Sequence, residues 1–116
     1  MNKSDKIITA AALAGIDIKI SEKETQTIKE NTTVLLYDKP CLDINRSDMQ
    51  LTIYKDTLCS RKSTRLMNSI IEQLTEQRVE SHNGVWYIKN RNKVKRSKIE
   101  KNMRIPITKA KILNPT

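Results

Sequence analysis

Two strong structural signals lie together in residues 61–88, RKSTRLMNSIIEQLTEQRVESHNGVWYI. The first part predicts an amphipathic helix over residues 61–77, because apolar side chains recur there at spacings of three and four. These side chains are Leu66, Met67, Ile70, Ile71 and Leu74. Ser60 or Ser63 is expected to cap the helix start. This helix is therefore the element against which a sheet is expected to pack.

A β-hairpin is predicted directly after this helix. Its turn is Asn83-Gly84, two residue types that accept the positive φ angles of a two-residue turn. The strands Val79–His82 and Val85–Ile88 flank it, and strand alternation places Trp86 and Tyr87 on opposite faces.

Upstream of the helix, the chain predicts a three-stranded antiparallel meander. The strands are Val34–Tyr37, Cys41–Ile44 and Gln50–Tyr54, each a short apolar or alternating run. Polar, turn-forming residues at 38–40 and 45–48 separate them.

The N-terminal third predicts a helix over residues 4–14, capped by Ser4 and ended by Gly15. Alternating isoleucines then indicate a half-buried strand over residues 16–20. Residues 21–31 remain ambiguous, since a capping-box pattern favours a helix and the threonines favour a strand.

These elements predict one α+β domain over residues 1–88, with a core at 31–88. In it, a small antiparallel sheet made of the meander and the hairpin packs on the main helix. Residues 89–116 are expected to form a basic C-terminal extension. Within it, Lys89–Lys111 carries ten Lys/Arg against one Glu. The apolar residues are too irregularly spaced for a clear helix, so this segment is either an appended basic helix or an arm that orders on binding.

Short segments between residues 31 and 88 also follow a recognisable order. An apolar strand with a tyrosine is followed by a turn, two more strands, a basic Thr/Ser-rich helix start and a Gly-x-Trp-Tyr ending. The matching segments are Val34–Tyr37, 38–40, Leu42 with Ile44, Leu51–Tyr54, Lys62–Asn68 and Asn83–Ile88. In this order the chain resembles a functionally uncharacterised domain of small phage and mobile-element proteins.

Two departures from that family are visible. Arg65 lies three residues before Asn68, where the family has its basic residue two before, and Pro40 lacks a preceding Gly. The resemblance implies a phage-like origin and a β-β-β-α-β-β core, and it implies no reaction.

Charge is distributed unevenly along this +9 chain. Residues 1–60 carry eight Lys/Arg against nine Asp/Glu, whereas residues 61–116 carry fourteen against four. A one-signed surface of this kind favours a polyanion or an acidic protein face as partner. A solvated face that only promotes solubility is the alternative explanation.

Two basic clusters are the candidate binding sites. At the helix start, unpaired N–H groups and the positive end of the helix dipole favour an anion. The residues there are Arg61, Lys62, Ser63 and Arg65. The alternative at this position is a serine cap with solvated basic neighbours.

The C-terminal cluster is expected to contact a phosphate backbone in a salt-sensitive way. Its members are Lys89, Arg91, Lys93, Lys95, Arg96, Lys98, Lys101 and Arg104. Trp86 precedes this cluster. Its ring either stacks on a base or fills the core, and the scarcity of other large side chains favours the core.

The sequence offers no catalytic, metal-binding or cofactor-binding constellation. His82 is the only histidine and falls in the hairpin, while Cys41 and Cys59 have no metal-type spacing and are expected to be free thiols. The apolar run at residues 7–16 is too short to cross a bilayer, so a cytoplasmic location is expected.

Three hypotheses about function follow. In the first, a phage-type protein binds DNA or RNA through the two basic clusters. In the second, a phage inhibitor docks on an acidic surface of a host or defence enzyme. A degenerate nuclease is the third. An exposed edge strand would allow a homodimer, although nothing in the sequence requires one.

Overall fold

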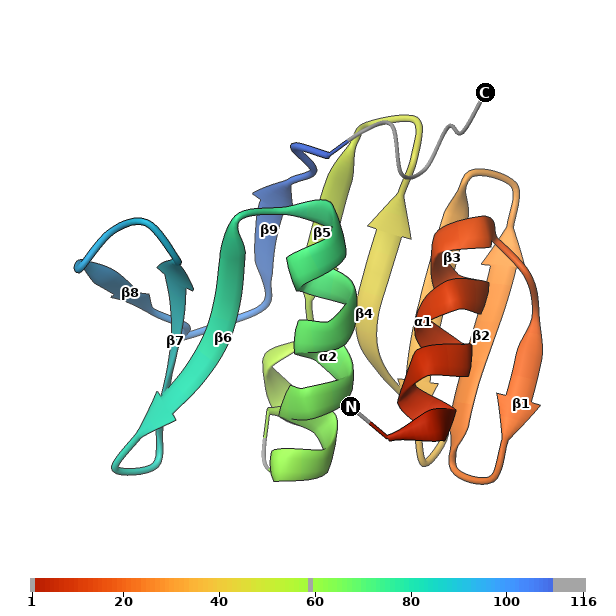
Figure 1. Cartoon of the computed structure of the whole chain (residues 1–116), viewed down its shortest axis with the longest axis horizontal. Helices are drawn as coiled ribbons and strands as arrows, with labels where there is room; N and C mark the ends of the chain where they lie inside the picture. Colours follow the sequence, from red (N-terminus) through yellow and green to blue (C-terminus); the bar gives the residue numbers. More distant parts are fainter. Residues whose placement is uncertain (1, 59, 110–116) are drawn as a thin grey trace.

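Two α-helices and two antiparallel sheets make up residues 2–58 and 60–109, the residues that the computed structural model describes (Figure 1). The helices are α1, Lys3–Ala14, and α2, Arg61–Leu74. The large sheet has the order β1-β2-β3-β4-β5-β9. Its strands are Ile18–Ile20, Lys23–Ile28, Asn31–Leu36, Lys39–Asn45, Gln50–Ile53 and Met103–Pro106. The small sheet contains β6, Gln77–His82, β7, Val85–Asn90, and β8, Arg96–Lys98.

The predicted α+β class is confirmed, and the hairpin lies in a sheet of its own. Both helices cover the same face of the large sheet, α1 over β1–β3 and α2 over β4 and β5 (Figure 1). α2 connects β5 to β6 and carries the chain away from the meander, so the hairpin does not extend it. The place beside β5 is taken instead by β9.

At the N-terminus, the structure corrects the predicted cap. Asn2 and not Ser4 caps α1, because the Asn2 side chain accepts a hydrogen bond from the Asp5 N–H at 2.8 Å. Gly15 ends the helix with φ at +71°, as its residue type predicts. The first strand begins at Ile18, and the ambiguous stretch that follows is strand β2, paired with β1 and β3.

Two tight turns have different residue types. Asn83 and Gly84 join β6 to β7 with φ of +52° and +78°, which confirms the predicted hairpin. Tyr37 and Asp38 join β3 to β4 with φ of +53° and +64°. Aspartate, like asparagine, accepts a positive φ, but tyrosine does not do so readily, so Tyr37 carries backbone strain that the first turn avoids.

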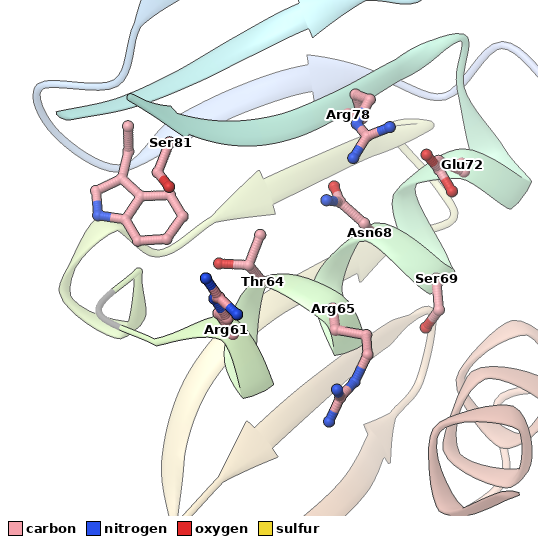
Figure 2. A pocket seen from close by; sticks show the side chains of 9 residues that line it. Arg61, Thr64, Arg65, Asn68, Ser69, Glu72, Arg78 and Ser81 are labelled. Atoms are coloured by element: carbon pink, nitrogen blue, oxygen red, sulfur yellow. The ribbon is translucent and has the colours of Figure 1, made fainter. Parts of the chain in front are cut away.

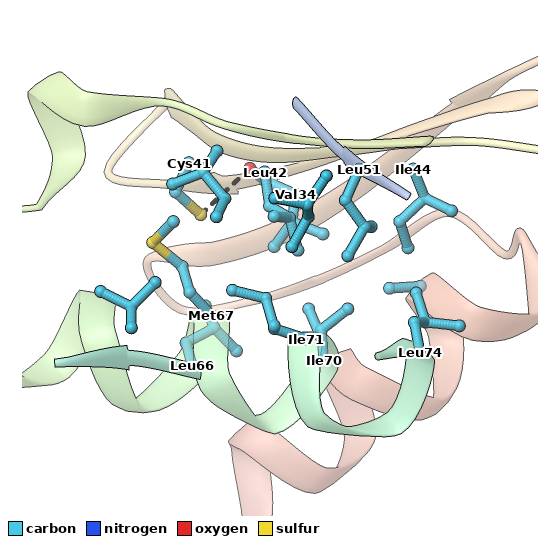
Figure 3. Close-up of a cluster of buried hydrophobic side chains, with 14 of the residues drawn as sticks. Val34, Cys41, Leu42, Ile44, Leu51, Leu66, Met67, Ile70, Ile71 and Leu74 are labelled. Atoms are coloured by element: carbon cyan, nitrogen blue, oxygen red, sulfur yellow. Dashed lines mark hydrogen bonds between the residues drawn. The ribbon is translucent and has the colours of Figure 1, made fainter. Parts of the chain in front are cut away.

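The core lies between α2 and the large sheet (Figure 3). The five apolar residues predicted on one face of the helix are all fully buried, against side chains of β3, β4 and β5. The opposing side chains include Val34, Leu42, Ile44 and Leu51. α2 itself begins at Arg61, capped by Ser60, and ends at Leu74, three residues before the predicted end.

Residues 89–109 do not form the expected appended helix or arm. Lys89 lies in β7, residues 96–98 form the edge strand β8, and residues 103–106 form β9. Just beyond β9, Thr108 and Lys109 donate their N–H groups to the Leu74 carbonyl at the end of α2. The boundary placed at residue 88 therefore divides a folded unit, and residues 110–116 of the expected extension fall outside the described residues.

Within residues 2–58 and 60–109, which also include the short 3-10 helix η1, Lys55–Thr57, no helix has the length and apolar character needed to cross a bilayer.

Candidate nucleic-acid groove

The exposed stripe of α2 and the adjacent hairpin form a basic groove, here called the α2–β6 groove. Its cavity measures about 500 Å³. The lining residues are Arg61, Thr64, Arg65, Asn68, Ser69, Glu72, Arg78, Ser81 and Trp86. In Figure 2, Arg78 and Ser81 lie on β6 and the other labelled residues lie along α2. The groove therefore follows the seam between the helix and the small sheet.

Asn68 holds the two sides of this seam together. Its side-chain amide donates to the Val79 carbonyl oxygen at 2.8 Å and its side-chain oxygen accepts from the Val79 N–H at 2.7 Å. A neighbouring β-strand would bond the N–H and C=O groups of β6 in the same way. Because Asn68 is buried, this pair of bonds fixes the distance between α2 and β6.

Arg65 is oriented by a buried acid of α1. Its Nε atom lies 3.2 Å from an Asp5 oxygen, and the other Asp5 oxygen lies 2.5 Å from the Lys23 ammonium. The Asp5 side chain is 0% exposed and that of Lys23 is 4% exposed, whereas half of the Arg65 side chain reaches solvent. Two cations share one carboxylate, so the group keeps a net positive charge.

Arg61 and Arg78 bring two more guanidinium groups to the groove. Both are exposed, and within the described residues neither has a side-chain hydrogen bond or ion pair. In Figure 2, Arg78 extends from β6 toward α2, while Arg65 points to the side of α2 that faces away from β6. Glu72 is the only acid among the lining residues, so the lining is net positive.

Trp86 contacts both the core and the groove. It lies opposite Ser81 in the β6–β7 pairing and is half-buried against the core. The same side chain lines the groove. An indole at the end of a guanidinium-lined groove can stack on a planar group.

Two residues of the predicted helix-start cluster are engaged elsewhere. Ser63 is buried. Its N–H donates to the hydroxyl oxygen of the cap residue Ser60 at 3.2 Å, and its own hydroxyl donates to the Ser60 carbonyl at 3.0 Å. Lys62 lies 2.8 Å from Glu22, donates to the Tyr37 hydroxyl at 3.2 Å and sits over the Tyr37 ring. The hydrogen bond from Lys62 to Glu22 lowers the pKa of Glu22 from 4.5 to about 2 and raises the pKa of Lys62. The structure therefore brings only Arg61 and Arg65 of the four to the groove.

Three residues of the C-terminal cluster lie on the outer face of the small sheet, the face opposite buried Val79 and Ile88. Strand register pairs Arg78 with Lys89 and Lys89 with Arg96, and it places Lys98 beside Tyr87. We call Arg78, Lys89, Arg96 and Lys98 the outer-face cluster. Arg78 also lines the groove, so the two basic surfaces meet at that residue.

The other residues of the C-terminal cluster are dispersed. Arg91 pairs with Glu76 at 3.1 Å. Lys93 and Lys95 are exposed between β7 and β8, and Lys101 is exposed between β8 and β9. Arg104 is exposed on β9 opposite Thr52, next to a buried Ile105 that faces the helices. It therefore lies on the face of the large sheet that points away from them.

Other polar groups form structural contacts. Burial raises the pKa of the Cys41 thiol to about 12, and its Sγ donates to the Val34 carbonyl (Figure 3). A hydrogen bond to Asp43 raises the pKa of the Tyr54 hydroxyl to about 12. In the described part of the chain, no three His, Cys, Asp or Glu side chains converge as metal ligands would. Cys59 lies outside that part.

Arg78 is the basic groove residue that the sequence predictions missed. The predicted hairpin strand began one residue later, at Val79, which left Arg78 in a linker. Extending the strand pairing around the Asn83-Gly84 turn by one residue would have placed Arg78 opposite Lys89.

Comparisons with protein-family models, with curated proteins and with solved structures find no significant match to this chain.

Proposed function

We propose that this protein binds nucleic acid through the α2–β6 groove and the outer-face cluster. The observation that carries the proposal is the placement of Arg61 and Arg78, from α2 and β6, on one concave surface beside Trp86, with Arg65 at its margin. Guanidinium groups match phosphate oxygens with paired hydrogen bonds, and they lose less hydration than an ammonium when they do so.

The charge of the small sheet supports the same proposal. Residues 77–98 carry seven Lys/Arg and one Glu. Among those seven, Arg91 pairs with Glu76, and Lys98 has only a 3.8 Å contact to Glu100. Exposed cations that the fold leaves without close acids release counterions when they meet a polyphosphate, and this release favours binding.

The test is the salt dependence of binding to fluorescein-labelled DNA and RNA, measured by fluorescence polarisation. For the wild-type protein, affinity should fall linearly with the logarithm of salt concentration. Arg61→Gln/Arg78→Gln should weaken binding and lower the slope by about 1.4 to 1.8, which corresponds to two phosphate contacts.

The matched control is Lys6→Gln/Lys29→Gln, which removes the same charge from exposed positions on α1 and in the β2–β3 turn. It should retain most of the affinity. If all forms fail to bind at low salt, or if the control loses as much as the arginine variant, the proposal is wrong.

A further inference from the structure

The shape of the α2–β6 groove distinguishes between forms of nucleic acid. Proteins that read a duplex insert a helix or a strand pair into one of its grooves, which requires a protruding basic element. Here the guanidinium groups of Arg61 and Arg78 line a hollow of about 500 Å³ instead. That volume falls in the range of pockets for small molecules, so one nucleotide fits where a duplex does not.

The two neighbouring aromatic residues differ in availability. The Tyr87 ring is covered by Arg96, whose Cζ lies 4.3 Å from the ring centroid, and its edge meets His82. Trp86 lines the groove, and no other aromatic residue does so. A base entering the groove therefore meets the indole of Trp86 as its stacking partner.

Most groups in the groove that could read the edge of a base are already bonded within the protein. Both hydrogen-bonding atoms of the Asn68 side chain are engaged by Val79. The Thr64 hydroxyl donates to the Ser60 carbonyl at 2.9 Å, and the Ser69 hydroxyl donates to the Leu66 carbonyl at 2.6 Å. What remains for a ligand is mainly guanidinium groups and an aromatic ring, which recognise phosphate and any base.

We infer that the groove takes an unpaired nucleotide of a single strand, with its base on Trp86 and its phosphates on Arg61 and Arg78, and with little preference among bases. This inference rests on the proposed function and adds the form of nucleic acid that is bound. Single-stranded stretches of either DNA or RNA have the required chemistry.

The intrinsic fluorescence of the protein offers a direct test, because Trp86 is the only tryptophan in the chain. Single strands of thymidine, adenosine or cytidine of equal length should each quench it, with similar affinities. A blunt duplex of the same length should bind at least about tenfold more weakly and quench less.

Variants of the two aromatic residues locate the site. Trp86→Leu should lower the affinity for single strands about 5- to 150-fold, because stacking is lost, while Trp86→Phe should lower it much less. Tyr87→Leu is the comparison variant on the opposite face of the same strand. Because the Tyr87 ring contacts Arg96 of the outer-face cluster, this variant should lower the affinity much less than Trp86→Leu does. Circular dichroism and thermal melting of each variant show whether it is folded. If Trp86→Leu does not fold, Trp86→Phe still tests the site, because it keeps an aromatic ring in the core.

The outcomes separate this inference from the proposed function. Salt-dependent binding that is as tight for duplex as for single strands, or that Trp86→Phe and Trp86→Leu leave unaltered, would overturn the inference and leave the proposed function in place. A large preference for one base would also overturn it. Absence of binding to any nucleic acid at low salt would overturn both.

Discussion

Two basic side chains packed against the large-sheet region are held closely by acids, whereas many of those around the α2–β6 groove and the small sheet are not. Lys23 is buried against Asp5, and Lys62 contacts Glu22. Arg61 and Arg78 have no such partner in the described residues. The same residue types therefore have two roles: Lys23 and Lys62 join elements of the fold, whereas Arg61 and Arg78 are available to a ligand.

The turns of the two regions differ in a corresponding way. The small sheet depends on Asn83-Gly84, residue types suited to its turn. The large sheet tolerates positive φ at Tyr37 and Asp38 because its strands are held by a buried apolar face. Local turn chemistry thus matters most where little core supports the strands.

The largest expected effect comes from breaking the buried charge arrangement in the large-sheet region. Asp5→Asn should lower the free energy of unfolding by about 3–5 kcal/mol, because Lys23 stays buried without a counter-charge. Urea denaturation followed by circular dichroism measures this change.

The matched variant for that prediction is Asp5→Asn/Lys23→Met, which also removes the unpaired buried cation. It should recover most of the lost free energy of unfolding. If Asp5→Asn alone costs less than about 1 kcal/mol, the buried group behaves like an exposed ion pair and the contrast between the regions weakens.

A smaller effect is expected at the turn of the small sheet. Gly84→Ala should cost about 1–2 kcal/mol, because a side chain at φ of +78° is strained. An added Cβ would meet no atom within 4 Å, so the cost arises from the backbone alone. Thermal and urea melts of Gly84→Ala and Gly84→Asn provide the measurement. Since asparagine accepts this conformation, an equal loss in both variants would contradict the explanation.

The smallest expected effect concerns the dependence of stability on pH. The pKa of Glu22 is about 2 in the folded protein and its ordinary value is 4.5. A lowered pKa contributes stability above the ordinary value, and this contribution is lost as pH falls from 4.5 toward 2. Lys62→Met removes the main cause of the shift, so its stability should fall less steeply over that interval in urea titrations. Parallel pH curves for both proteins would show that Lys62 is not engaged with Glu22.

The local parts of this fold were predictable from sequence, and the long-range parts were not. The spacing of Leu66, Ile70 and Leu74 predicts α2, and Asn83-Gly84 predicts its hairpin, because both patterns depend on near neighbours. β9 was missed although Ile105 and Ile107 lie two residues apart, as residues on one face of a strand do. Its partner Leu51 lies far away in sequence, and a local pattern does not choose between distant partners.

The candidate site shows the same division. Arg61 and Arg65 were identified from their place at a helix start. Sequence did not show that Lys62 turns toward Glu22, because that contact joins elements 40 residues apart. Nor did it show the clamp between Asn68 and Val79, which requires α2 and β6 to be side by side.

The position of β9 has a consequence for synthesis of the protein. β5 and β9 are neighbours in the large sheet, yet α2 and the whole small sheet lie between them in sequence. A nascent chain therefore exposes the edge of β5 until residues 103–106 leave the ribosome. An open edge can pair with a strand of another chain, so the interval before β9 emerges is when aggregation is most favoured. Pairing of β9 with β5 also places Thr108 and Lys109 at the C-terminal end of α2. The hydrogen bonds that end the groove helix therefore form last.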